Sequence, residues 1–192
     1  MAYASASDLK VYLGISSTAD DTLIGSILTR AQKIVETECG RVFEASADTT
    51  HTLDAIADVD GMTLYLDGDL CSVTSVTNGD SVAVASTEYI PDPRNATPYY
   101  ALTMKGSAGK SWGYTTDPEN AITIVGKWAY SATAPADIVH ATIRLGAWMY
   151  RQKDSGMDGD RVLSADGVLV MPAAIPNDVQ AILKPYRRKE FR

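Results

Sequence analysis

One long amphipathic stretch, residues 18–43, most constrains what this chain can fold into. Its apolar residues recur at the spacing of a single stripe along an α-helix, and polar residues occupy the opposite face. The stripe consists of Leu23, Ile24, Ile27, Leu28, Ala31, Ile34, Val35 and Cys39. Thr18 and Asp21 have the spacing of a capping box, and Gly40 stands where a left-handed residue ends a helix. The pattern predicts a long helix with one buried face.

Both chain ends predict further helices. Ser5 and Asp8 have capping-box spacing, and Gly14 follows as a stop for a short helix that forms a hairpin with the long one. Near the other end, a short helix is predicted to begin at Pro176 and to end at Pro185. The helical segments of the two ends are expected to build one core.

A third amphipathic helix is predicted from Pro135 to about residue 150. Its apolar arc is too wide to be covered by one neighbour, because Ile143, Ala147 and Trp148 extend the main stripe around the side. These three residues either pack inside the chain or contact another subunit, and the sequence favours neither alternative.

Residues 44–130 follow a different pattern, with short runs rich in Val, Thr, Tyr and Ile between Gly, Asp, Asn and Pro turns. The runs are 49–53, 62–66, 72–76, 81–84, 89–90, 100–105 and 121–128. Such spacing is typical of a small antiparallel sandwich or barrel, and Asn78-Gly79 is its strongest hairpin signal. We therefore predict an α+β fold: a helical core from both chain ends (1–43 and 131–192) with an inserted small antiparallel β module (44–130).

Composition restricts the function. The net charge of −7 over 192 residues disfavours wrapping of nucleic acid, which needs Lys and Arg to displace counterions. No apolar run is long enough for a membrane span and no secretory signal pattern opens the chain, so we expect no membrane contact and synthesis in the cytoplasm. Cys39 and Cys71 are expected to be free thiols.

The search for catalytic or ligand-binding motifs returns weak matches. Gly106–Ser111 is similar to a phosphate-binding loop, but Met104 stands where the first glycine belongs and no helix can follow, so a hairpin loop is expected. His51 and His140 lack metal-ligand spacing. A sugar platform on Trp112, Trp128 and Tyr99-Tyr100 is less favoured than core packing. We expect no enzyme activity, no cofactor and no metal.

Residues 153–174 are dense in Gly and Asp and lack helical periodicity, so a long loop is predicted. Its carboxylates are Asp154, Asp158, Asp160 and Asp166. They lack the spacing of an EF-hand, which favours a solvated acidic loop over a calcium site. They are candidates for facing a channel or a partner.

Both chain ends resemble the head–tail connector (adaptor) proteins of tailed bacteriophages. The resemblance covers about half of the chain, in order. Its segments are DLKVYLGI at 8–15, DDTL at 20–23, ECGRVF at 38–43, GKWAY at 126–130, APADIV at 134–139, YR at 150–151 and LKPYRR at 183–188. The resemblance implies a non-enzymatic virion structural protein of the neck, made in the host cytoplasm. The β module is where the chain departs from the shortest, nearly all-helical members.

The resemblance also implies partners. Such proteins form a homo-oligomeric ring of roughly twelvefold symmetry beneath the portal protein, extend the DNA channel without binding DNA specifically, and dock the next neck or tail protein. The portal-binding end corresponds to a loose basic tail, 185–192, which orders on assembly and includes Tyr186, Arg187, Arg188, Lys189 and Arg192. The apolar residues Ile143, Ala147 and Trp148 are then candidates for the ring interface. The alternatives are another tail-completion or tail-tube component and, less favoured, a ligand-binding protein built on the β module.

Overall fold

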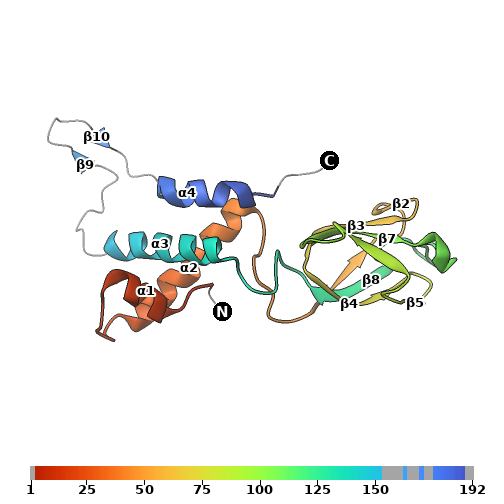
Figure 1. The fold of residues 1–192 in the computed structure, drawn as a ribbon, viewed down its shortest axis with the longest axis horizontal. Coiled ribbons are helices and arrows are strands. Elements are labelled where there is room, and N and C mark those ends of the chain that lie inside the picture. Colours follow the sequence, from red (N-terminus) through yellow and green to blue (C-terminus); the bar gives the residue numbers. More distant parts are fainter. Residues whose placement is uncertain (1–2, 153–161, 164–168, 171–174, 189–192) are drawn as a thin grey trace. The chain divides into compact units, whose positions relative to one another are not determined.

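Helices from both chain ends pack together, and antiparallel sheets lie between them in the sequence (Figure 1). The computed structural model describes residues 3–152, 162–163, 169–170 and 175–188. The chain divides into two compact units: a helical unit, Met1–Gly40 with Pro135–Arg192, and a β unit, Arg41–Ala134. The predicted α+β fold class, with a helical core from both chain ends, is confirmed.

The helical unit is built around its third helix. Its helices are α1 (Ala6–Leu13), α2 (Asp21–Cys39), α3 (Ala136–Gln152) and α4 (Asn177–Leu183), with the 3-10 turn η2 (Lys184–Tyr186) after α4. Two short strands, β9 (Val162–Leu163) and β10 (Leu169–Val170), pair with each other. Helix α3 packs against α1, α2 and α4. Gly146 permits this close packing, because an added Cβ would lie 3.3 Å from Leu28 and 3.4 Å from Leu9.

The predicted ends of the helices are mostly confirmed. The Asp8 amide donates to Ser5 Oγ (3.1 Å) while the Ser5 amide donates to the Asp8 carboxylate (2.8 Å), which completes a capping box at α1. Gly40 adopts a φ of 65° and its amide donates to the carbonyls of the last turn of α2. The capping box predicted at Thr18 is wrong: Thr18 contributes only its carbonyl oxygen, and the Asp21 carboxylate pairs with Lys10 (2.8 Å).

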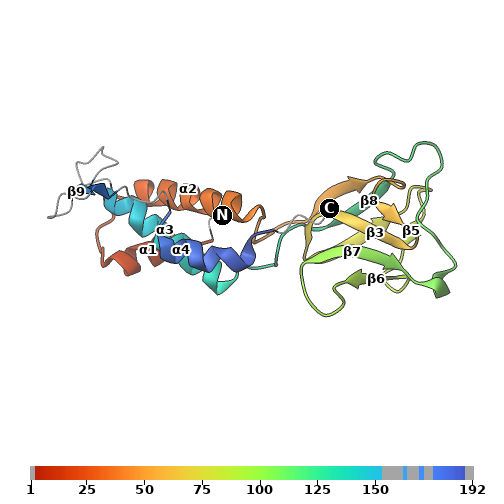
Figure 2. The same cartoon turned by 90° about the horizontal axis from the view of Figure 1, so that it is seen from above.

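The β unit is a sandwich of two four-stranded sheets with strand orders β1-β8-β4-β5 and β2-β3-β7-β6. Its strands are β1 (Thr49–Leu53), β2 (Val59–Asp60), β3 (Thr63–Leu70), β4 (Ser72–Thr77), β5 (Ala83–Val84), β6 (Tyr89–Asp92), β7 (Tyr99–Met104) and β8 (Ile122–Lys127). All pairs are antiparallel, as for β6 and β7, which run side by side in Figure 2. Every predicted strand is present, and β2 was not predicted.

The two sheets share one core. Ile122 and Ile124 of β8 and Leu64 and Leu102 of β3 and β7 are fully buried in the same cluster. The alternation that predicted β8 is visible in its burial, since every second residue points inward. The inward side chains of both sheets therefore form the interior of the sandwich.

The chain enters and leaves the β unit through two segments, 41–44 and 129–134, that bond to each other. The Tyr130 amide donates to the Val42 carbonyl (2.9 Å), and Ser131 Oγ donates to the Phe43 carbonyl (3.1 Å). Arg41 lies over the Tyr130 ring at 5.3 Å. Its guanidinium pairs at 3.5 Å with Asp69, whose side chain is 4% exposed. This buried pair fixes the entering segment to the sandwich.

In the residues that the structure describes, no helix is long and apolar enough to cross a membrane.

Candidate functional site

The first part of the basic tail is tied to the helical unit. The Arg188 amide donates to the Cys39 carbonyl at the end of α2 (2.8 Å), and Arg187 forms an ion pair with Glu38. The Tyr186 hydroxyl lies 3.3 Å from the Asp137 carboxylate. The expectation of a loose tail from residue 185 is therefore wrong for residues 186–188, because the last turn of α2 and the first turn of α3 provide partners. Lys189 and Arg192 lie outside the described residues, and the role of the tail in portal contact stays a prediction.

The three interface candidates of α3 differ in exposure. Ala147 is 2% exposed and belongs to a buried cluster with Leu9 and Leu28. Ile143 packs against the same cluster and is half-buried. Trp148 is also half-buried. Of the three candidates, only Ile143 and Trp148 therefore have side-chain surface left for a subunit interface, and the interface itself stays a prediction. The loop candidates Asp154, Asp158, Asp160 and Asp166 lie outside the described residues.

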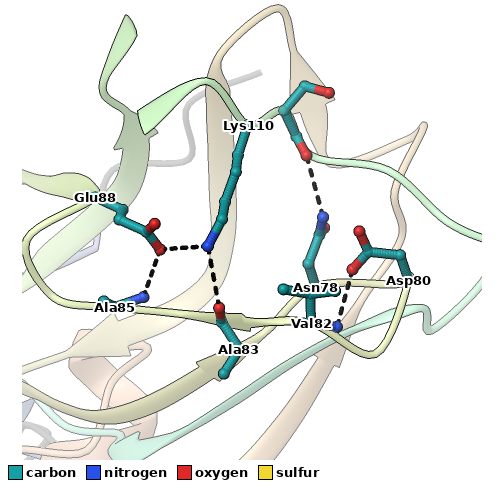
Figure 3. A network of polar contacts seen from close by, with 8 residues as sticks. Asn78, Asp80, Val82, Ala83, Ala85, Glu88 and Lys110 are labelled. Carbon is teal, nitrogen blue, oxygen red and sulfur yellow. Dashed lines mark hydrogen bonds and ion pairs between the residues drawn. The ribbon is translucent and has the colours of Figure 1, made fainter. Parts of the chain in front are cut away.

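The segment similar to a phosphate-binding loop holds the sandwich together. It forms a 3-10 turn, η1 (Gly106–Ala108), which confirms that no α-helix opens here. Lys110 extends from it to the Glu88 carboxylate (2.8 Å) and the Ala83 carbonyl (3.4 Å), as Figure 3 shows. Hydrogen bonds from Lys110 and from the Ala85 amide lower the pKa of Glu88 below its ordinary value. The lysine is occupied by this cross-link rather than presented to a phosphate.

Asn78 and Gly79 connect the β4–β5 hairpin to the segment that precedes β8. The Asn78 side chain, labelled in Figure 3, donates to the Ser111 carbonyl (3.1 Å) and accepts from the Gly113 amide (3.1 Å). The predicted hairpin is confirmed, but its left-handed residue is Ser81, with a φ of 66°, rather than Gly79. A glycine is required at position 79 because the backbone there lies close to the backbone at Gly113. An added Cβ would lie 2.4 Å from the Gly113 carbonyl oxygen.

The two tryptophans considered for a sugar platform differ in exposure and surroundings. Trp112 is 6% exposed in the core, where its indole N–H donates to the Met62 carbonyl (2.9 Å). Trp128 is half-buried, and its ring stacks at 3.8 Å on that of His51, which contacts the Asp67 carboxylate at 3.0 Å. Core packing and a stacked pair on the sandwich account for both tryptophans.

The described residues give little support for a metal site or a reactive thiol. Within them, no three His, Cys, Asp or Glu residues are grouped so that they could hold a metal ion. Neither Cys39 nor Cys71 forms a disulfide, as predicted. Burial raises the pKa of the Cys71 thiol above its ordinary value, which lowers the thiolate fraction and hence its reactivity.

Charge is distributed unevenly between the two units. The β unit holds twelve Asp and Glu residues against five Lys and Arg residues, whereas the helical unit holds twelve of each. The β unit therefore carries the whole net charge of −7. Two of its five cations, Arg41 and Lys110, are already paired with carboxylates. A surface of this kind repels phosphate groups and attracts basic protein surfaces.

Comparison with known proteins identifies the family. The model of the family described as "Head completion protein" matches residues 3–189, nearly the whole chain. The chain belongs to the head completion protein family. Among curated proteins, none matches it.

Solved structures show that this head completion protein shares its fold with phage-like particle components. One match is a chain in "Neck of empty GTA particle computed with C6 symmetry", with a TM-score of 0.61 and 19% identity over 97% of this chain and 90% of that chain. Another is a chain in "Virion of native gene transfer agent (GTA) particle", with a TM-score of 0.56 and the same identity and coverage. The fold thus extends over both units.

The sequence patterns did not predict one surface of the β unit. The loops at residues 54–62, 78–82 and 112–121 meet at one end of the β unit, and they expose apolar side chains among carboxylates. The absence of Lys and Arg from all three segments is visible in the sequence. Their meeting is not, because it depends on the antiparallel pairing of β1 and β4 with β8.

Proposed function

We propose that the protein is a head–tail connector (adaptor) of a phage-like virion. It forms a ring beneath the portal protein, extends the channel through which DNA passes, and docks the next neck or tail component. The observation that carries the proposal is the family match over residues 3–189, together with the likeness of the whole fold to a chain in a particle neck. The protein resides in the virion neck after synthesis in the host cytoplasm, and its role is structural rather than enzymatic.

Ring formation is supported by the helical unit and by the symmetry of the related particle. Ile143 and Trp148 leave α3 with apolar surface that the chain does not fully cover. Heterologous contacts between identical subunits close into rings when the rotation per subunit divides the circle. The related neck was computed with C6 symmetry, with which a ring of roughly twelve copies is compatible.

Portal attachment is assigned to the basic tail. Residues 186–188 are held by their bonds to Asp137 of α3 and to Glu38 and Cys39 of α2, so the chain leaves the helical unit from a fixed point. Arg188, Lys189 and Arg192 lie close together in the sequence. Their positive charges pair with acidic groups of the portal. Because charge pairs at an interface guide association, this attachment is sensitive to salt.

The acidic β unit suits a channel for DNA. Contacts between DNA phosphates and Lys or Arg side chains would hold the DNA and slow its passage. The β unit, with its net charge of −7, makes few such contacts. DNA therefore passes the ring without specific binding.

The test removes the end of the tail while preserving the bonds at residues 186–188. One variant ends at Arg188, and a second carries Lys189→Glu with Arg192→Glu. Both are expected to keep the α-helical circular dichroism of the wild type and to be absent from purified DNA-filled heads. Arg30→Glu is the matched control, since Arg30 is an exposed cation on α2 and should not affect attachment. Attachment of both tail variants at the wild-type level would refute the portal role, and recovery of the chain only with tails would favour a tail-completion component.

A further inference from the structure

Three loops form one continuous surface at an end of the β unit, called here the acidic loop end and defined as residues 54–62, 78–82 and 112–121. It lies where β1 and β4 end and β8 begins. Segments 41–44 and 129–134, through which the chain enters and leaves, adjoin the opposite ends of β1 and β8. The acidic loop end is thus the end of the β unit remote from its connections.

Hydrogen bonds join the three loops of this surface to one another. The Ala55 amide donates to the Pro118 carbonyl (2.8 Å), and the Asn120 amide donates to the Asp54 carboxylate (2.6 Å). The Thr115 amide donates to the Gly79 carbonyl (3.2 Å), which joins the third loop. The loops therefore hold their side chains in fixed relative positions, which lowers the ordering cost of binding a partner.

The acidic loop end exposes four large apolar side chains. Ile56 is 60% exposed, Val82 46%, Tyr114 45% and Met62 36%. These residues sit on the same three hydrogen-bonded loops, whereas scattered single exposures would need no explanation. A cluster of exposed apolar groups with a polar border is the arrangement of a protein-binding surface.

The charged residues of the three segments are all acidic. They are Asp54, Asp58, Asp60, Asp80, Asp117 and Glu119, with no Lys or Arg in any of the three segments. Asp60, Asp117 and Glu119 are exposed, and no ion pair is formed by them within the described residues. The nearest lysine in the sequence, Lys110, is paired with Glu88, as Figure 3 shows. Nucleic acid and a second acidic loop end are both repelled by such a border.

We propose that the acidic loop end binds a different protein of the neck through a segment that presents Lys or Arg around an apolar side chain. The apolar side chain packs among Ile56, Val82 and Tyr114, and the cations meet Asp60, Asp117 and Glu119. The inference rests on the proposed connector function and specifies the surface and the chemistry of its contact with the component that follows. Charge complementarity selects the partner and speeds association, while the apolar contact supplies most of the binding energy.

The first experiment produces particles with altered loop ends. Asp60→Asn with Asp117→Asn and Glu119→Gln removes three of the six border charges, and Ile56→Ser removes the most exposed apolar side chain of the surface. Each change is expected to leave the chain in DNA-filled heads but to lower the fraction of heads that carry a tail, by about tenfold for the triple variant. The matched controls are Asp92→Asn, an exposed carboxylate outside the loops, and Val11→Ser, an 80% exposed apolar residue of α1. Both controls should assemble normally.

The outcomes separate the inference from the function on which it rests. Normal tailing of the Ile56 and triple variants, or loss of these folded variants from heads, would overturn the inference and leave the connector function intact. Absence of the wild-type chain from the neck would overturn the connector function itself.

A second experiment identifies the partner's chemistry directly. A carbodiimide cross-linker joins carboxylates to lysine amines without a spacer, so it is applied to intact wild-type particles. Cross-links from Asp60, Asp117 or Glu119 to lysines of another virion protein are expected. Cross-links from these residues only to copies of this chain would contradict the proposed occupant.

Discussion

The substitution Gly79→Ala tests most sharply how the loops of the β unit are held. Gly79 does not have a positive φ, so alanine causes no backbone strain by itself. Its Cβ would, however, lie 2.4 Å from the Gly113 carbonyl oxygen and 2.7 Å from the Ala121 Cβ. Both contacts are far shorter than van der Waals distance, and neither atom belongs to a flexible side chain that could move away.

The expected cost combines two effects. Overpacking against rigid neighbours costs about 2 kcal/mol. The forced separation also breaks the bond from the Thr115 amide to the Gly79 carbonyl, which contributes about 1 kcal/mol. The free energy of unfolding of the β unit should therefore fall by about 3 kcal/mol. For a unit of residues 41–134, this lowers the melting temperature by about 15 °C.

Thermal and urea unfolding followed by tryptophan fluorescence and near-ultraviolet circular dichroism measure this change. Gly106→Ala is the matched control, because it lies in a neighbouring loop and its added Cβ meets nothing within 4 Å. The control should stay within about 0.5 kcal/mol of the wild type. If Gly79→Ala is as stable as Gly106→Ala, the close packing of the three loops is refuted.

Three further substitutions test ion pairs. Asp69→Asn leaves the Arg41 charge buried without its carboxylate and should cost about 3 kcal/mol in urea unfolding, whereas Asp67→Asn, at an exposed carboxylate, should cost under about 1 kcal/mol; equal costs would contradict the importance of burial. On the helical surface, the Arg144 hydrogen bond lowers the pKa of Asp178 below its ordinary value of 3.8. Its stabilisation is therefore complete above that value and is lost as the pH falls through the lowered pKa. Arg144→Met should cost about 0.5 kcal/mol at pH 7 and less as the pH falls through the lowered pKa of Asp178, and a cost that does not change with pH would exclude this origin.

Local sequence patterns predicted the elements of this protein well. The stripe that predicted α2 is buried at Ile24, Leu28 and Val35, and the alternation around Ile122 and Ile124 predicted β8. These successes share one cause: the hydrophobic period depends only on neighbours along the chain and on which side faces the core.

The wrong details depend on contacts that no local pattern contains. The capping box at Thr18 failed because Lys10, from another helix, takes the Asp21 carboxylate. The tail at Arg187 and Arg188 was expected to be loose, yet the end of α2 offers it partners. In each case a residue distant in sequence supplied the deciding partner.

The strand β2 and the acidic loop end were missed for related reasons. Val59–Asp60 is too short to show a period and is defined only by its pairing with β3. The acidic loop end is assembled by the bonds of Asn78, Gly79 and Asn120, each of which joins residues more than thirty positions apart. Recognition of such a surface requires the strand pairing as well as the sequence.

The connector account is tested most directly by cryo-electron microscopy of the neck of a virion that carries this chain. The account predicts a closed ring of identical copies, with the C-terminal tails against the portal and the acidic loop ends against the next protein. Location of the chain in the tail tube, or in the neck as a single copy without a ring, would contradict it.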